Sequence, residues 1–229
     1  MFNPAVTGLL IFLVMIVAII AQVRVSSAFK RYSQVRARAG RTGAEVAEEI
    51  LADSGITDVE IVPGESFLGD HYDPTKKQLC LSPGVYNSES VAAVGIAAHE
   101  CGHAIQHKQA YAPLQIRMAV VPVTMVASQM LPFIFIGGFM FGLFRAIPWL
   151  LDLGIGVYAI LTFFQLITMP VGFDASRRAK LVLTQRGIVT AEESGGVSKV
   201  LNAAAWTYVA AFLSALVYLL HLLALRRRG

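Results

Sequence analysis

The sequence predicts an α+β membrane protein with about four transmembrane helices and one small cytoplasmic unit. Two observations predict this class. Hydrophobic residues make up 55% of the 229-residue chain and charged residues only 15%, an unusual balance for a soluble protein. The apolar residues gather in four long runs, and a long segment of mixed composition separates the first run from the second.

The four apolar runs cover residues 2–23, 118–144, 146–173 and 200–225. Each is long enough to cross a hydrocarbon layer of about 30 Å, which takes roughly 20 helical residues. Asp152 is their one charged residue, and His221 adds a titratable imidazole. The first run lacks a basic leader and a small-residue cleavage site, so we expect a retained anchor rather than a cleaved signal peptide.

Clusters of basic residues follow the first and third runs, and the positive-inside rule places both clusters in the cytoplasm. Four crossings would put the arginines of the basic tail on the far face, which the same rule disfavours, so the side of the C-terminus stays open. The expected parts are an anchor (1–25), a cytoplasmic unit (26–117), a transmembrane helical pair (118–172), a second cytoplasmic segment (173–199) and a transmembrane helix with the basic tail (200–229).

The net charge of +4 does not indicate nucleic-acid binding, because the cations flank membrane runs without interleaved aromatic residues. Cys80 and Cys101 are expected to be reduced thiols in the cytoplasm.

Capping and turn residues predict the elements of the cytoplasmic unit. Thr42 with Glu45 three residues later is a capping box for a helix over 42–54. A short strand is expected over 59–62, and a hairpin around the turn residues Asp73 and Pro74. Ser88 or Ser90 caps the next helix, which extends to about Lys108.

That last helix carries the sequence HECGH at residues 99–103. On a helix, His99 and His103 project from one face and can bind one metal ion, with Glu100 adjacent as a general base. Neutral imidazoles with one carboxylate suit the open tetrahedral site of Zn²⁺. His107 cannot complete the same tetrahedron, because it lies about 12 Å along the axis from His99. A carboxylate from a later helix is therefore the expected third ligand.

The chain resembles the YugP-type membrane zinc metallopeptidases, which are distant relatives of the HtpX-type proteases. The stretches that carry the resemblance span nearly the whole chain: DHYDPTKKQLCLSPGVY, AAHECGHAIQH, PVGFDASRRAKLVL and VLNAAAWTYVAAFLSAL. The resemblance implies a gluzincin-like site in the cytoplasmic unit, with His99 and His103 as ligands, Glu100 as base and a glutamate after the third span as third ligand.

The sequence departs from this pattern at Gly172, which stands where the resemblance places the ligand glutamate. Asp174 is the candidate substitute, although on a regular helix it lies about 200° around the axis from position 172. Three alternatives stay open here: Asp174 completes the site, water completes it, or this chain is an inactive form.

The expected function is that of a zinc metalloendopeptidase in the bacterial plasma membrane, acting on membrane or membrane-adjacent polypeptides. Leu79 and Leu81 are expected on an edge strand that pairs with extended substrate. Other membrane proteins or a second copy of the chain are further candidate partners. The alternative is a catalytically inactive scaffold or chaperone-like protein, which Gly172 favours.

Overall fold

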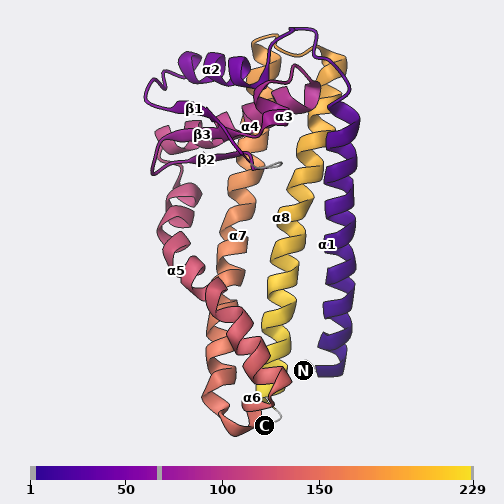
Figure 1. Ribbon diagram of the computed structural model, residues 1–229, viewed down its shortest axis with the longest axis vertical. Helices are drawn as coiled ribbons and strands as arrows, with labels where there is room; N and C mark the ends of the chain where they lie inside the picture. Colours follow the sequence, from indigo (N-terminus) through magenta and orange to yellow (C-terminus); the bar gives the residue numbers. More distant parts are fainter. Residues whose placement is uncertain (1–3, 66–68, 228–229) are drawn as a thin grey trace. The chain divides into compact units, whose positions relative to one another are not determined.

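The computed structural model describes residues 4–65 and 69–227, so residues 66–68 of the expected hairpin region and Arg228 of the basic tail lie outside the described part. The elements in chain order are α1 (Pro4–Tyr32), α2 (Gly43–Asp53), β1 (Glu60–Pro63), β2 (His71–Asp73), β3 (Gln78–Leu81), α3 (Pro83–Tyr86), α4 (Val91–Lys108), α5 (Ala112–Phe135), the π-helical turn η1 (Ile136–Met140), α6 (Leu143–Ala146), α7 (Pro148–Gln185) and α8 (Ala191–Arg226) (Figure 1).

Four of these helices are long and apolar enough to cross a membrane, which confirms the number of spans that the sequence predicts. The candidate spans are Ala5–Tyr32, Ala112–Gly138, Trp149–Gln185 and Ala191–Arg226. The helices α7 and α8 contain 38 and 36 residues. At about 1.5 Å per residue both exceed the thickness of a hydrocarbon layer. The segment 173–199 is thus the end of one long helix, a short turn and the start of the next.

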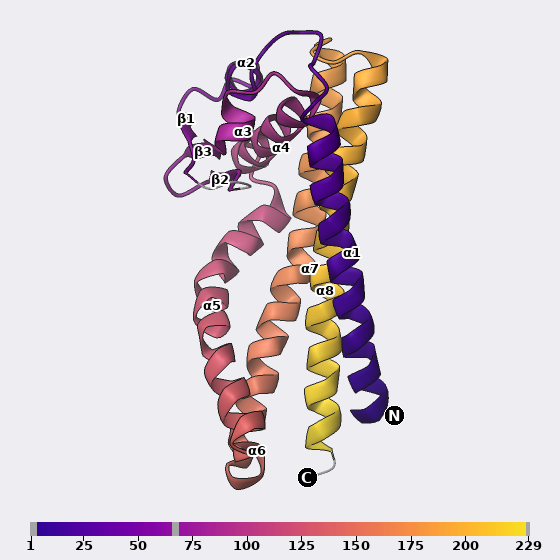
Figure 2. The ribbon, with the colours of Figure 1, turned by 45° about the vertical axis from the view of Figure 1, so that its right-hand side comes forward.

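The chain divides into two compact units. The first contains residues 1–21, 115–169 and 207–229, and the second contains 22–114 and 170–206. In the first unit, α5 and α7 are joined through η1 and α6 (Figure 2) and share a small core around Ala127, Ile134 and Val157. The second unit holds the sheet, α2, α3 and α4 around a larger apolar core.

The sheet of the second unit has three strands in the order β1-β3-β2. β1 pairs in parallel with β3, and β2 pairs with β3 as the predicted antiparallel hairpin. The prediction that Leu79 and Leu81 lie on an edge strand is wrong, because β3 is the central strand and both side chains are fully buried. The open edge on the hairpin side belongs to β2.

The predicted helix starts are confirmed. Thr42 and Glu45 form a reciprocal capping box at α2, and the Ser90 hydroxyl accepts a hydrogen bond from the Ala93 amide at the start of α4. Between the hairpin and α4 the structure adds the short helix α3, which is not among the elements that the sequence predicts. The Ser90 cap sets where α4 begins.

The helices α4 and α7 approach most closely at Gly102. A Cβ atom at this position would lie 2.7 Å from the carbonyl oxygen of Ala175 and 3.1 Å from its Cα atom. Backbone atoms cannot move aside as a flexible side chain can, so only glycine fits here without displacing one helix. The crossing brings the histidine motif of α4 against the buried face of α7.

We predict that Gly102→Ala lowers the stability of the protein by about 1–3 kcal/mol, because the added methyl group overpacks the crossing. The matched control is Gly195→Ala. Gly195 is an exposed helical glycine with no atom within 4 Å of an added Cβ, so alanine there should be neutral or stabilising by up to about 1 kcal/mol. Thermal unfolding in detergent, followed by circular dichroism, compares the two variants. Equal melting temperatures for both would contradict the tight crossing.

Candidate metal centre

The two histidines of the motif lie together on α4, as the sequence predicts. Their ring centroids are 4.8 Å apart and the rings are nearly perpendicular, at 82°. His99 is 7% exposed and Glu100 is 8% exposed. Two imidazoles one helical turn apart, with a carboxylate beside them in a buried setting, are suited to hold a divalent ion and to handle a proton next to it.

Each imidazole uses its Nδ1 atom for a contact within the protein. The Nδ1 atom of His99 is 3.1 Å from the Ser176 hydroxyl oxygen on α7. The Nδ1 atom of His103 is 3.0 Å from Oε1 of Gln106, one turn further along α4. Contacts of this kind orient the rings of metal-binding histidines and assign the Nε2 atoms to the metal. The two residues therefore fit two positions of a zinc ion.

Burial favours the neutral form of the first histidine. Loss of solvent lowers the pKa of His99 well below its usual value, and the neighbouring His103 lowers it further. A neutral imidazole is the form that binds a metal. Cys101 lies between the two histidines in sequence, but its side chain is on the opposite face of α4. Its thiol donates a hydrogen bond to the Ala47 carbonyl of α2 at 3.6 Å. Burial raises the pKa of this thiol, so it stays protonated.

The structure does not bring Asp174 to the two histidines. One of its carboxylate oxygens accepts a hydrogen bond from Nε2 of Gln106 at 2.9 Å, and its oxygens form ion pairs with Arg177 and Arg178. The helix α7 is regular through this region, so the unwinding that would turn Asp174 toward position 172 is absent. Asp174 as third ligand stays a prediction that this arrangement does not support.

Within residues 4–65 and 69–227, no three histidine, cysteine, aspartate or glutamate side chains are grouped closely enough to hold a metal ion. Gly172 is buried and lies one helical turn before Ser176, whose hydroxyl contacts His99. Position 172 is thus on the side of α7 that faces the histidine motif, but glycine brings no donor there. Among the described residues, the candidate site therefore consists of the two imidazoles with Glu100 beside them, and position 172 adds no ligand.

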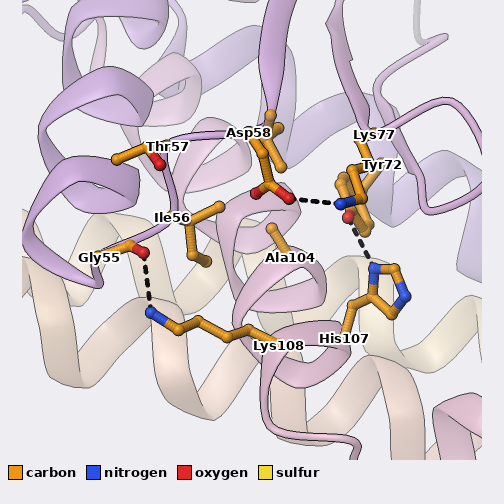
Figure 3. Close-up of a pocket in the computed structure, with 10 residues that line it drawn as sticks. Gly55, Ile56, Thr57, Asp58, Tyr72, Lys77, Ala104, His107 and Lys108 are labelled. Carbon is orange, nitrogen blue, oxygen red and sulfur yellow. Dashed lines mark hydrogen bonds and ion pairs between the residues drawn. The ribbon is translucent and has the colours of Figure 1, made fainter.

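The remaining histidine of α4 fastens the hairpin to the helix. His107 Nδ1 is 2.8 Å from the Tyr72 hydroxyl of β2, so His107 is a structural partner of the edge strand rather than a ligand. Figure 3 shows this contact at the rim of a pocket of about 490 Å³. On the same rim, Lys77 pairs with Asp58, and Lys108 donates to the Ser54 and Gly55 carbonyls at the end of α2.

Sequence reasoning did not identify Ser176, Gln106 or Tyr72 as contacts of the three histidines of α4. Gln106 carried a signal, because it lies three residues after His103, a spacing at which helical side chains meet. Ser176 and Tyr72 are 77 and 35 residues from their histidines. No local pattern in the sequence indicates contacts over such separations.

Residues 7–227 match a family described as "Putative neutral zinc metallopeptidase". The chain belongs to this family. Over 200 residues it is 46% identical to a protein named "Putative membrane protease YugP" from Bacillus subtilis (strain 168), and the alignment covers 87% of each chain. No solved structure matches the chain. The description of the family indicates zinc as the metal that the paired imidazoles would hold. The name of the Bacillus subtilis relative, a membrane protease, agrees with the four apolar helices of this chain.

We predict that zinc binds weakly to this neutral zinc metallopeptidase and at least about tenfold more tightly to Gly172→Glu. The new carboxylate would add a direct ligand on the motif-facing side of α7, and even indirect partners of a metal change its affinity by about 10–100-fold. Zinc affinity of both purified forms is measured by competition with a fluorescent chelator. Gly195→Glu adds the same charge at an exposed position and should leave the affinity unchanged. Equal zinc affinities for the native chain and Gly172→Glu would contradict the missing-ligand interpretation.

Proposed function

We propose that this chain is a membrane-embedded zinc metalloendopeptidase that hydrolyses peptide bonds of membrane or membrane-adjacent proteins. The observation that carries the proposal is the pair of imidazoles on one buried helix, each oriented through Nδ1, with Glu100 beside them. The family description and the name of the relative support the reaction class.

His99 and His103 would hold the metal, and water would take the remaining positions. A bound zinc ion acts as a Lewis acid toward the scissile carbonyl and lowers the pKa of water next to it. Glu100 would accept the proton of the attacking water and donate it to the leaving amine. Its low exposure keeps competing bulk water away from the carboxylate.

The open edge of β2 is the place where an extended substrate would add to the sheet. Peptides bind exposed sheet edges through main-chain hydrogen bonds, and β2 is the edge strand on the hairpin side. Tyr72 connects this strand to α4 through His107, one turn after His103. The edge is therefore fixed with respect to the helix that carries the metal ligands.

The proposal includes a location. The four apolar helices support a position in the bilayer, and the basic clusters after the first and third runs favour a cytoplasmic position for the second unit. Substrates would then be polypeptides that lie at or near the cytoplasmic face of the bacterial plasma membrane.

A second candidate is an inactive scaffold or chaperone-like role. The observation that favours it is that the described residues contain no third metal ligand beside the histidine pair. In that case partners would bind without being cleaved, and substitution of Glu100 would leave binding unchanged. The two candidates differ in whether any hydrolysis depends on Glu100.

We predict that Glu100→Gln lowers the rate of casein hydrolysis by at least about 100-fold, because general base catalysis is worth about 10²–10⁴-fold and glutamine cannot accept the proton. The variant is nearly isosteric, so folding and zinc content should be retained. Glu48→Gln makes the same change at an exposed position of α2 and should keep full activity. If no hydrolysis by the native chain is sensitive to Glu100, the scaffold role replaces the protease.

We predict that Tyr72→Phe raises KM for a peptide substrate several-fold with little change in kcat, because it loosens the edge strand but leaves the metal ligands in place. Loss of the hydroxyl contact should also reduce the free energy of unfolding by about 0.5–1.5 kcal/mol. Tyr86→Phe, outside the strands, is the control. A fall in kcat with unchanged KM would show that substrate does not use this edge.

A further inference from the structure

Gln106 is a fully buried polar side chain at the centre of the contact between α4 and α7. Its Oε1 atom is 3.0 Å from Nδ1 of His103. Its Nε2 atom is 2.9 Å from the Val171 carbonyl oxygen and 2.9 Å from a carboxylate oxygen of Asp174. A buried amide is costly unless its hydrogen-bonding groups are satisfied, and here donors and acceptor are all engaged.

The contacts of Gln106 with Val171 and Asp174 of α7 fix the orientation of its side-chain amide. Both partners of Nε2 are oxygens, a main-chain carbonyl and a carboxylate, and neither has a hydrogen to donate. A flipped amide would set its own oxygen against those two oxygens and lose both hydrogen bonds. The amide nitrogen therefore faces α7, and Oε1 of Gln106 faces His103 only as an acceptor.

Because Oε1 of Gln106 can only accept, its hydrogen bond with His103 requires a hydrogen on Nδ1 of His103. In a neutral imidazole with its hydrogen on Nδ1, the lone pair lies on Nε2. We propose that Gln106 is a positioning residue, which holds His103 in the Nδ1–H tautomer and so presents Nε2 to the metal. The proposal rests on the proposed function for the identity of the metal, but the tautomer itself is a property of the metal-free protein.

Asp174 has a specific part in this chain of contacts. Arg177 and Arg178 form ion pairs with its carboxylate from the next turn of α7. Arg178 also donates to Gln109, the residue that follows the end of α4. Asp174, held on α7 by the two guanidinium groups, gives the Gln106 amide a fixed acceptor. This carboxylate therefore acts on the metal ligand through Gln106 instead of binding the metal.

The other histidine has no equivalent constraint from its partner. The Ser176 hydroxyl can donate to or accept from Nδ1 of His99, because a hydroxyl group rotates. Of the two Nδ1 contacts, the one from Gln106 to His103 selects a tautomer, and the one from Ser176 to His99 does not. This difference makes His103 the histidine on which the test is carried out.

The test combines solid-state NMR and zinc affinity on the full chain in lipid bilayers. Histidine labelled with ¹⁵N reports at pH 8 whether the hydrogen of His103 is on Nδ1 or Nε2 in the metal-free protein, and the His103→Gln spectrum assigns the signal. Competition with a fluorescent chelator gives the affinity for zinc alone. Three variants are compared with the native chain: Gln106→Met, Gln106→Glu and Gln109→Met.

The expected results follow from which contact each variant removes. Gln106→Met has no acceptor, so the Nε2–H form of His103 should appear and zinc affinity should fall about 10–100-fold. Gln106→Glu keeps an acceptor for Nδ1–H, so the tautomer should be retained although the contacts with the Val171 carbonyl and with Asp174 are both lost. Gln109→Met removes the contact between the C-cap residue of α4 and Arg178 of α7, and it should change neither measurement.

A tautomer that is unchanged in folded Gln106→Met, or that is lost equally in Gln106→Met and Gln106→Glu, overturns the proposal. If the Gln106 variants do not fold, Asp174→Ala tests the same contacts. It should populate the Nε2–H form in part and weaken zinc binding several-fold, and unchanged values would again overturn the proposal. Absence of zinc binding by the native chain would contradict the proposed function alone, because the tautomer measurement does not need the metal.

Discussion

The close crossing of α4 and α7 at Gly102 is the constraint on which the candidate site depends. It allows the backbone of one helix to touch that of the other at Ala175. At that distance a serine hydroxyl can reach His99, and a glutamine of α4 can reach the main chain of α7. A wider separation would remove these contacts and leave the histidines on a helix with no partner to orient them.

Near this crossing, His99, His103 and Gln106 each contact a polar partner. The histidine face of α4 contacts α7, and the opposite face packs through Cys101 on α2. The hairpin is fastened at the end of α4 through His107 and Tyr72. The sheet covers the apolar core of the second unit, and β2, the edge strand on the hairpin side, is the strand that is fastened to the motif helix.

Much of this arrangement could be predicted from local sequence. Caps such as Thr42 and Ser90 act within one turn, and the spacing of His99 and His103 places them on one helical face whatever surrounds them. The order of the strands could not be predicted, because parallel pairing of β1 with β3 depends on contacts across the chain. For the same reason the sequence did not show that Asp174 would meet Gln106 and two arginines.

The orientation of Cys101 bears on which ions the proposed site would attract. Its thiol faces α2 and stays protonated, so the side of α4 that faces α7 presents imidazole nitrogens and no sulfur. Thiolates favour soft ions such as Cu(I), whereas imidazoles suit borderline ions such as zinc, nickel and Cu(II). At the proposed site, the packing of this one small side chain would therefore contribute to metal selectivity, because a thiol that faces α2 is not available as a ligand for softer ions.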